Sequence, residues 1–133
     1  LGETYVLMVR QPRLATGKLV WEVPAGMLDG ESENIKGKMM NEIEEETGII
    51  PQKEKLVYLD TSYSSCGITD EKYIFFSMEI DPKCVLNINP ENLGEDDEII
   101  KNIQIFNINK APQEDVKFLA LKCLFLDAKS TGK

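Results

Sequence analysis

The chain has 133 residues, of which 42% are hydrophobic, so it can bury one core and predicts a single domain over residues 1–133. Its formal net charge of −8 argues against a nucleic-acid groove lined by lysine and arginine. Histidine is absent, which excludes a nucleophile that depends on a histidine base and removes the commonest zinc ligand.

The cysteines and the apolar runs indicate a compartment. Cys66, Cys84 and Cys123 are far apart and form no CxxC pair, as in a cytosolic protein with reduced thiols. No apolar run reaches membrane-spanning length, so we expect no membrane partner and a cytoplasmic location. Because the sequence opens abruptly at Leu1, we also expect an N-terminal segment to precede it.

The first half of the chain predicts two strands, a loop and a helix. The first strand is apolar enough on both faces to be covered, and the second one stops at Pro24. Gly48 is suited to cap the end of the helix, and Pro51 prevents its continuation. The expected ranges are a strand over 4–13, a turn over 15–18, a strand over 19–26, a loop over 25–33 and a helix over 34–47.

The second half predicts three strands and a closing helix. Strands over 55–64 and 72–80 are joined by a short loop and could form a hairpin. A long polar loop is expected over 81–97, a strand over 98–108 and a helix over 112–129. Strands interleaved with two helices indicate a mixed α/β (α+β) domain.

The first helix carries an unusual acidic run, because Glu42, Glu44, Glu45 and Glu46 fall within five residues. At about 100° per residue, Glu42 and Glu46 stand one turn apart beside the apolar stripe, whereas Glu44 points away. Like charges at this spacing repel, and turning them towards the core adds a desolvation cost. A solvated face explains Glu44, but a hard divalent cation explains Glu42 and Glu46 better.

The stretch "PAGMLDGESENIKGKMMNEIEEETGI" resembles a Nudix box, whose pattern is GX5EX7REUXEEXGU with U aliphatic. Gly48 and Ile49 end the match, and the acids fall at Glu45, Glu46 and Glu42. Further back, Glu33 lies where the early glutamate belongs and Gly26 where the glycine belongs, with six intervening residues in place of five. Asn41 stands where the pattern has an arginine that pairs with box glutamates, and an asparagine lacks the charged fork.

The resemblance extends to the ADP-ribose and ADP-sugar pyrophosphatase branch of the family, through "VLMVRQPR", "WEVPAGMLD" and "GEDDEII". It implies a mixed β-sheet sandwiched between helices, and hydrolysis of the diphosphate linkage of a nucleoside diphosphate sugar with Mg2+ or Mn2+. It also implies a homodimer, with N-terminal strands that would lie before Leu1. The implied metal ligands are Glu42, Glu46, Glu45 and the Ala25 carbonyl, with Glu45 and Glu46 also placed in the catalytic machinery. The implied base is Glu98, with Asp97 and Glu95 as alternatives.

The resemblance also implies substrate contacts. Arg13 is favoured over Arg10 as a phosphate ligand, and an ordinary surface role is the alternative for both. Trp21 could stack on a base, although core packing explains a lone tryptophan equally well. Gly26 and Met27 of the loop complete the implied substrate-binding set.

Two other functions are compatible with these residues. One is a Nudix enzyme for another nucleotide, such as a dinucleotide cofactor or a nucleoside triphosphate. The other is a non-catalytic domain that binds a nucleotide sugar, which Asn41 and the longer loop would favour. The retained acids at 42, 45 and 46 oppose it, because a pure binding domain has no need of a costly acid cluster.

Overall fold

In the computed structural model, residues 3–28, 34–50, 55–81 and 103–132 are described. The strands among them form two antiparallel sheets. The first has the order β2-β1-β5, built from β1 (Tyr5–Arg13), β2 (Lys18–Glu22) and β5 (Ile103–Asn107). A 3-10 turn (Leu14–Thr16) and Gly17, at φ 70, join β1 to β2. Glycine suits this turn because it adopts positive φ without steric cost.

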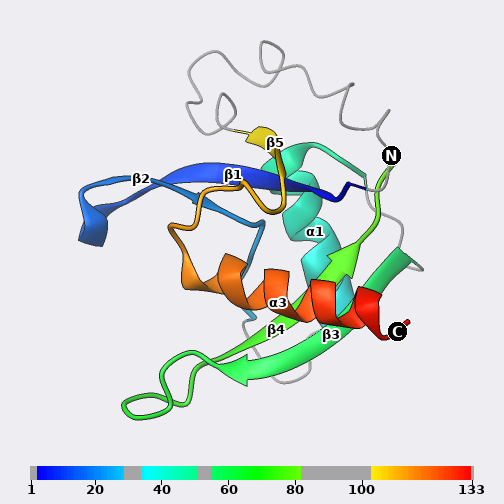
Figure 1. The fold of residues 1–133 in the computed structure, drawn as a ribbon. Helices are drawn as coiled ribbons and strands as arrows, with labels where there is room; N and C mark the ends of the chain where they lie inside the picture. Colours follow the sequence, from blue (N-terminus) through cyan, green and yellow to red (C-terminus); the bar gives the residue numbers. More distant parts are fainter. Residues whose placement is uncertain (1–2, 29–33, 51–54, 82–102, 133) are drawn as a thin grey trace.

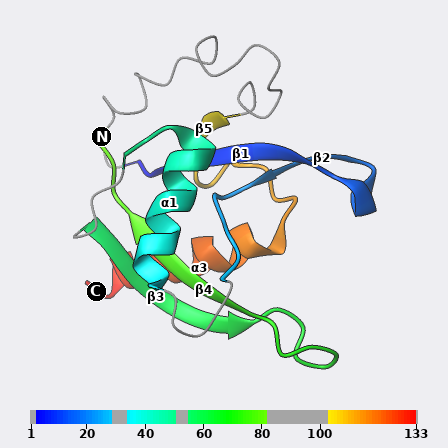
Figure 2. The same ribbon diagram turned by 180° about the vertical axis from the view of Figure 1, so that it is seen from behind.

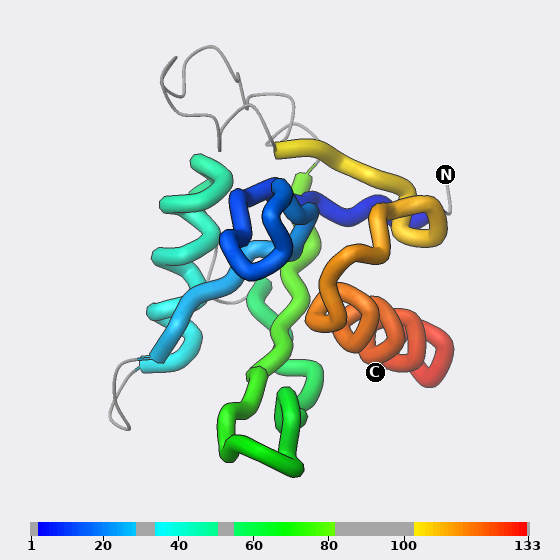
Figure 3. Tube along the Cα trace, turned by 90° about the vertical axis from the view of Figure 1, so that its left-hand side faces the viewer, coloured from blue at the N-terminus to red at the C-terminus, as the bar shows by residue number. Residues whose placement is uncertain are grey.

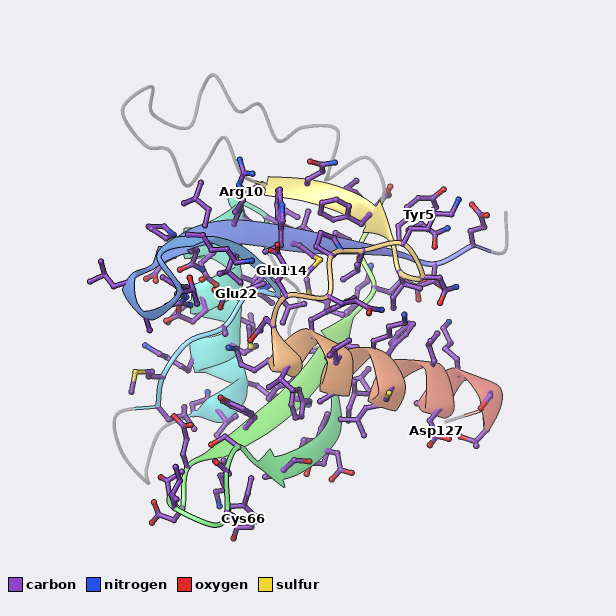
Figure 4. The ribbon with its side chains drawn as sticks, turned by 60° about the vertical axis from the view of Figure 1, so that its left-hand side comes forward. Tyr5, Arg10, Glu22, Cys66, Glu114 and Asp127 are labelled. Atoms are coloured by element: carbon purple, nitrogen blue, oxygen red, sulfur yellow. The ribbon has the colours of Figure 1, made fainter. Side chains whose placement is uncertain are left out.

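The second sheet is the predicted hairpin. It pairs β3 (Leu56–Tyr63) with β4 (Lys72–Met78), and the register shifts between Tyr58 and Asp60. Cys66 is exposed at the loop end of this hairpin (Figure 4).

The predicted acidic helix is α1 (Ile35–Thr47), with bounds close to those expected. The Asn34 side chain caps its start by accepting a hydrogen bond from the Gly37 amide at 3.0 Å. Gly48 ends it in the left-handed conformation at φ 78, as the sequence predicts. Ile43 and Thr47 are the buried residues of this helix, and Met39 packs against the cluster of Ile43, whereas Ile35 at the start of the helix is 39% exposed.

The closing helix is α3 (Val116–Ser130), which begins four residues later than predicted. Asp115 is extended, at φ −130 and ψ 128. Its carbonyl accepts a hydrogen bond from the Phe118 amide at 3.1 Å, in the first turn of the helix. The second strand is also shorter than predicted. It ends at Glu22, and residues 23–28 have no regular secondary structure. Pro24 has no amide hydrogen, so it cannot extend the ladder.

The strands lie between the two helices, with α1 on one side and α3 on the other (Figures 1 and 3). Alternate residues of β1 serve the two sides, because successive side chains of a strand point to opposite faces. Met8 joins the core cluster with Phe118 of α3, whereas Leu7 packs against the cluster of Ile43 in α1. The α/β fold with helices on both sides of the strands is therefore confirmed.

The two core clusters have different members. The α3 cluster contains Met8, Val23, Ile108, Ala111 and Phe118. The α1 cluster contains Ile43, Ile49 and Leu56, with Phe76 and Met78 of β4 packed against it, so that α1 lies across the hairpin (Figure 2). Neither helix of the described ranges has the length and hydropathy that a bilayer span requires.

Candidate metal and catalytic site

The loop after β2 and the acidic face of α1 meet at Glu46. This carboxylate accepts a hydrogen bond from the Ala25 amide at 2.9 Å through Oε2, and one from the Gln11 side chain at 3.2 Å through Oε1. Gln11 lies on β1, so three segments far apart in the sequence converge on one carboxylate.

Glu42 lies against the same loop. A Cβ atom built on Gly26 would approach the Cγ, Cδ and Oε1 atoms of Glu42 to less than 3.0 Å, so only a glycine lets the loop come this close. The Lys38 ammonium lies 3.2 Å from Oε1 of Glu42 and makes an ion pair with it. Glu42 and Glu46, which the sequence places one turn apart, thus both lie against the Ala25–Gly26 loop.

The electrostatics of this pair favour a cation. The pKa of Glu46 is raised to about 7, mainly because burial disfavours its charged form. The hydrogen bond from the Ala25 amide opposes the shift, and the negative charge of Glu42 adds to it. A divalent cation between the two carboxylates would stabilise the charged form of both.

The donor atoms fit Mg2+ or Mn2+. The described residues contain no group of three or more acidic, histidine or cysteine side chains that converge on one point. Two carboxylates and a loop carbonyl are nevertheless sufficient, because Mg2+ prefers hard oxygen ligands and keeps several of its waters. The predicted set of Glu42, Glu46 and the Ala25 carbonyl is of this kind, and the contact that the structure describes at Ala25 is made by its amide. Glu45, which directly precedes Glu46 on the helix, is exposed.

Arg13 reaches this region through Glu22. The Glu22 side chain is only 3% exposed, and it accepts two hydrogen bonds from Arg13, from Nε at 2.6 Å and from Nη2 at 2.8 Å. Such a bidentate pair fixes the orientation of the guanidinium. The hydrogen bonds to Glu22 raise the pKa of Arg13, and the charge of Glu46 adds a smaller contribution, which places this arginine within electrostatic range of Glu46.

Arg10 and Trp21 lie on the other face of the same two strands. They are register partners, and the Arg10 guanidinium lies 5.0 Å from the centroid of the indole ring. Trp21 also makes an edge-to-face contact with Phe106 and packs against the α3 cluster. The structure thus separates these two residues from the face that carries Gln11 and Arg13.

The remaining predicted residues are exposed or lie outside the described ranges. Met27 has 78% of its surface exposed. Glu98, Asp97 and Glu95 fall outside the described residues, as does Glu33, so their assignments stay predictions.

Three side chains of the site were not identified from the sequence. Gln11 shares its strand face with Arg13, which is the signal that could have identified it. Glu22 is a charged residue inside the otherwise apolar stretch "LVWEV", which is typical of a buried ion pair. Lys38 stands one turn before Glu42, and a spacing of four residues predicts contact on a helix.

A family description, the NUDIX domain, matches residues 1–123 of the chain. The chain is similar to "Nudix hydrolase 14, chloroplastic" of Arabidopsis thaliana, with 42% identity over 56% of this chain and 27% of that protein. It is also similar to nudix hydrolase 2 of Caenorhabditis elegans, with 32% identity over 75% of this chain and 44% of that protein. A Nudix hydrolase of Schizosaccharomyces pombe is 30% identical over 78% of this chain and 49% of its own length.

The aligned part thus spans between about a quarter and a half of the length of these relatives. The family match covers most of the chain, including the Ala25–Gly26 loop and all of α1. The loop and helix whose carboxylates converge are the segments that carry the box pattern. The chain therefore belongs to the NUDIX domain family.

Proposed function

We propose that this domain hydrolyses the diphosphate linkage of a nucleoside diphosphate sugar of the ADP-ribose or ADP-glucose type. Water adds across the linkage, so that a nucleoside monophosphate and a sugar phosphate are formed. The observation that carries the proposal is the convergence of Glu42 and Glu46 on the Ala25–Gly26 loop. An acid pair that costs desolvation energy at this place is expected when it binds a cation.

In this proposal Glu42, Glu46 and the Ala25 carbonyl would hold Mg2+ or Mn2+, with Glu45 as a further ligand. The cation supplies charge to the phosphoryl oxygens and lowers the pKa of a bound water. The Ala25 amide and Gln11 keep Glu46 oriented. We assign the proton-accepting role to Glu98, with Asp97 and Glu95 as alternatives.

Substrate contacts are proposed for the face that carries the acid pair. Arg13 is held by Glu22 through Nε and Nη2, which leaves the hydrogens of Nη1 to be directed at a phosphate oxygen. Gly26 and Met27 are proposed to contact the substrate from the loop. Arg10 and Trp21 lie on the α3 side of the sheet, away from the face that carries Gln11 and Arg13. Their contacts with the nucleotide stay predictions.

The choice of a nucleoside diphosphate sugar rests on the resemblance of the segments around Arg13 and Glu22 to the ADP-sugar branch. Another nucleotide substrate within the family is the second candidate. A domain that binds a nucleotide sugar without cleaving it is the third, and Asn41 in place of the box arginine is the observation that favours it.

The test is release of phosphate from a panel of nucleotide sugars, with Mg2+ and a coupled phosphatase. We expect cleavage of ADP-ribose or ADP-glucose, and a loss of about a hundredfold in Glu46→Gln, which corresponds to about 2.7 kcal/mol. Glu44→Gln is the matched control, because Glu44 is exposed on the same helix. If a nucleotide sugar binds but no product is released with Mg2+ or Mn2+, the hydrolase proposal is wrong and the function is that of a non-catalytic binding domain.

A further inference from the structure

Lys38 offers a positive charge to the acid pair from a position where the family pattern does not require one. Its ammonium lies 3.2 Å from Oε1 of Glu42, and the two side chains are 28% and 16% exposed. The pair is therefore partly shielded from water, so its attraction is less screened than that of an ordinary surface pair.

The stability of the helix does not explain this lysine. Lys38 lies near the start of α1. The first turn contains no acidic residue that could pair with it there. The positive end of the helix dipole disfavours cations there. A lysine that precedes a glutamate by four residues is also the weaker of the two possible orders.

The geometry does explain it. Asn41 occupies the place of the box arginine, is exposed and carries no charge. Lys38 precedes Asn41 by three residues, and side chains at this spacing lie on the same side of a helix. In the box pattern an arginine at position 41 pairs with box glutamates, and here Lys38 makes such an ion pair with Glu42.

Glu42 is consequently held from two sides. The backbone of Gly26 confines its Cγ, Cδ and Oε1 atoms from the loop side, and Lys38 binds Oε1 from the helix side. Glu46 is oriented independently by the Ala25 amide and Gln11. The orientation of both acids is thus provided by groups other than an arginine at position 41.

We propose that Lys38 is a positioning residue that supplies, at Glu42, the charge missing at Asn41. This inference rests on the proposed hydrolysis for its catalytic consequence, whereas the ion pair itself is tested without turnover. It implies that the departure at Asn41 is compensated within the same helix and does not mark a loss of activity.

The kinetic test compares Lys38→Met with Lys38→Arg, Asn41→Arg and the double variant Lys38→Met/Asn41→Arg. We expect Lys38→Met to lower kcat by about tenfold, which corresponds to about 1.4 kcal/mol. Lys38→Arg should keep activity within about threefold of the wild type, and Asn41→Arg should restore the activity lost in Lys38→Met. Lys36→Met is the matched control on the same helix and should leave kcat unchanged.

Two kinetic results would overturn the proposal. One is a kcat of Lys38→Met equal to that of Lys36→Met. The other is a double variant as slow as Lys38→Met alone, because a lysine that only stabilises the helix cannot be replaced from position 41.

A second measurement does not depend on turnover or on metal. Thermal unfolding is followed in a chelating buffer for the wild type, Lys38→Met, Glu42→Gln and their combination. We expect Lys38→Met to lower Tm by about 1–2 °C in the wild type and to have no effect in the Glu42→Gln background. Equal shifts in both backgrounds would show that Lys38 does not hold Glu42. If no nucleotide is cleaved by the wild type, the proposed function fails, and this unfolding cycle alone decides the contact.

Discussion

Gly26 and Glu42 show how one missing side chain shapes the site. The sequence predicts a glycine in a loop, but only the structure shows that its Cα faces the carboxylate of Glu42. The contact brings the loop close enough for the Ala25 amide to bind Glu46. A larger residue at position 26 would therefore disturb both acids through the loop that connects them.

We predict that Gly26→Ala lowers kcat by at least about tenfold while Tm changes by less than about 2 °C. The added methyl group displaces the flexible Glu42 side chain, which costs little stability but misplaces a proposed metal ligand. Steady-state kinetics and thermal unfolding measure the two effects. Gly67→Ala is the control, because nothing lies within 4 Å of a Cβ at Gly67 and its φ is not positive. A Gly26→Ala variant as active as Gly67→Ala would contradict the assigned role of the loop.

Glu46 makes the stability of the metal-free protein depend on pH. Its pKa of about 7 in the folded state lies above the ordinary value of 4.5, mainly because of burial. Between these two pH values the folded state binds more protons than the unfolded state, so the free energy of unfolding decreases as the pH rises. Above pH of about 7 this contribution is lost and the dependence ends.

We therefore expect Tm in a chelating buffer to fall between pH 5 and 7 more steeply for the wild type than for Glu46→Gln, since the variant lacks the titrating group. Added Mg2+ should flatten the difference, because it binds the charged form. Glu44→Gln serves as the control and should follow the wild type. Parallel curves for the wild type and Glu46→Gln would show that Glu46 does not carry the shifted pKa.

At the scale of elements, residues 114–117 connect the start of α3 to β2. Glu114 accepts a hydrogen bond from the Trp21 amide at 3.0 Å, on the edge strand of the sheet. Lys117 lies 3.7 Å from Glu22 and 3.1 Å from Asp115. Figure 4 shows Glu22 and Glu114 in the region between β2 and the first turn of α3. The closing helix thus stabilises the strand that leads into the site loop.

Lys117→Met should destabilise the fold by about 1–3 kcal/mol, because it leaves the buried Glu22 with Arg13 as its remaining cation among these contacts. Urea denaturation gives the free energy of unfolding, with Lys122→Met on the same helix as the matched control. Lys117→Arg should recover most of the loss. If Lys117→Met and Lys122→Met are equally stable, the network does not contribute to stability.

At the scale of the whole molecule, β1 joins two clusters that would otherwise be separate cores. Met8 faces the α3 cluster and is fully buried, and Leu7 packs on the α1 cluster. Each cluster contains residues from distant parts of the chain, so neither one can form without the other segments. We expect both to unfold in one transition.

Phe118→Ala should lower the free energy of unfolding by about 3–5 kcal/mol, because Phe118 is 1% exposed at the centre of the α3 cluster. Fluorescence of Trp21, which packs on this cluster, and far-UV circular dichroism should report the same midpoint in urea. Val116→Ala is the control, since Val116 is 66% exposed on the same helix. Two separate midpoints would show that the clusters unfold independently.

The local pattern predicted the elements and part of the site. The helix over 34–47 and the hairpin of β3 and β4 follow from apolar periodicity, Gly48 and the turn residues, and all of these act over a few positions. β2 ended earlier than predicted because Pro24 cannot extend the ladder, and α3 began later than predicted. Just before α3, Glu114 accepts a hydrogen bond from the Trp21 amide, a contact across 93 residues. Periodicity cannot report a contact of that range.

The sequence by itself determined the family and the loop glycine, through the spacing of the box pattern. It also determined the acid pair of Glu42 and Glu46, because spacing along one helix decides which side chains share a face. Only the tertiary structure decided which groups hold those acids. Gln11 and the Ala25 amide reach Glu46 because β1, the loop and α1 pack together, and Arg13 is directed by Glu22 across two paired strands. Those partners depend on the packing of elements, which local spacing does not encode.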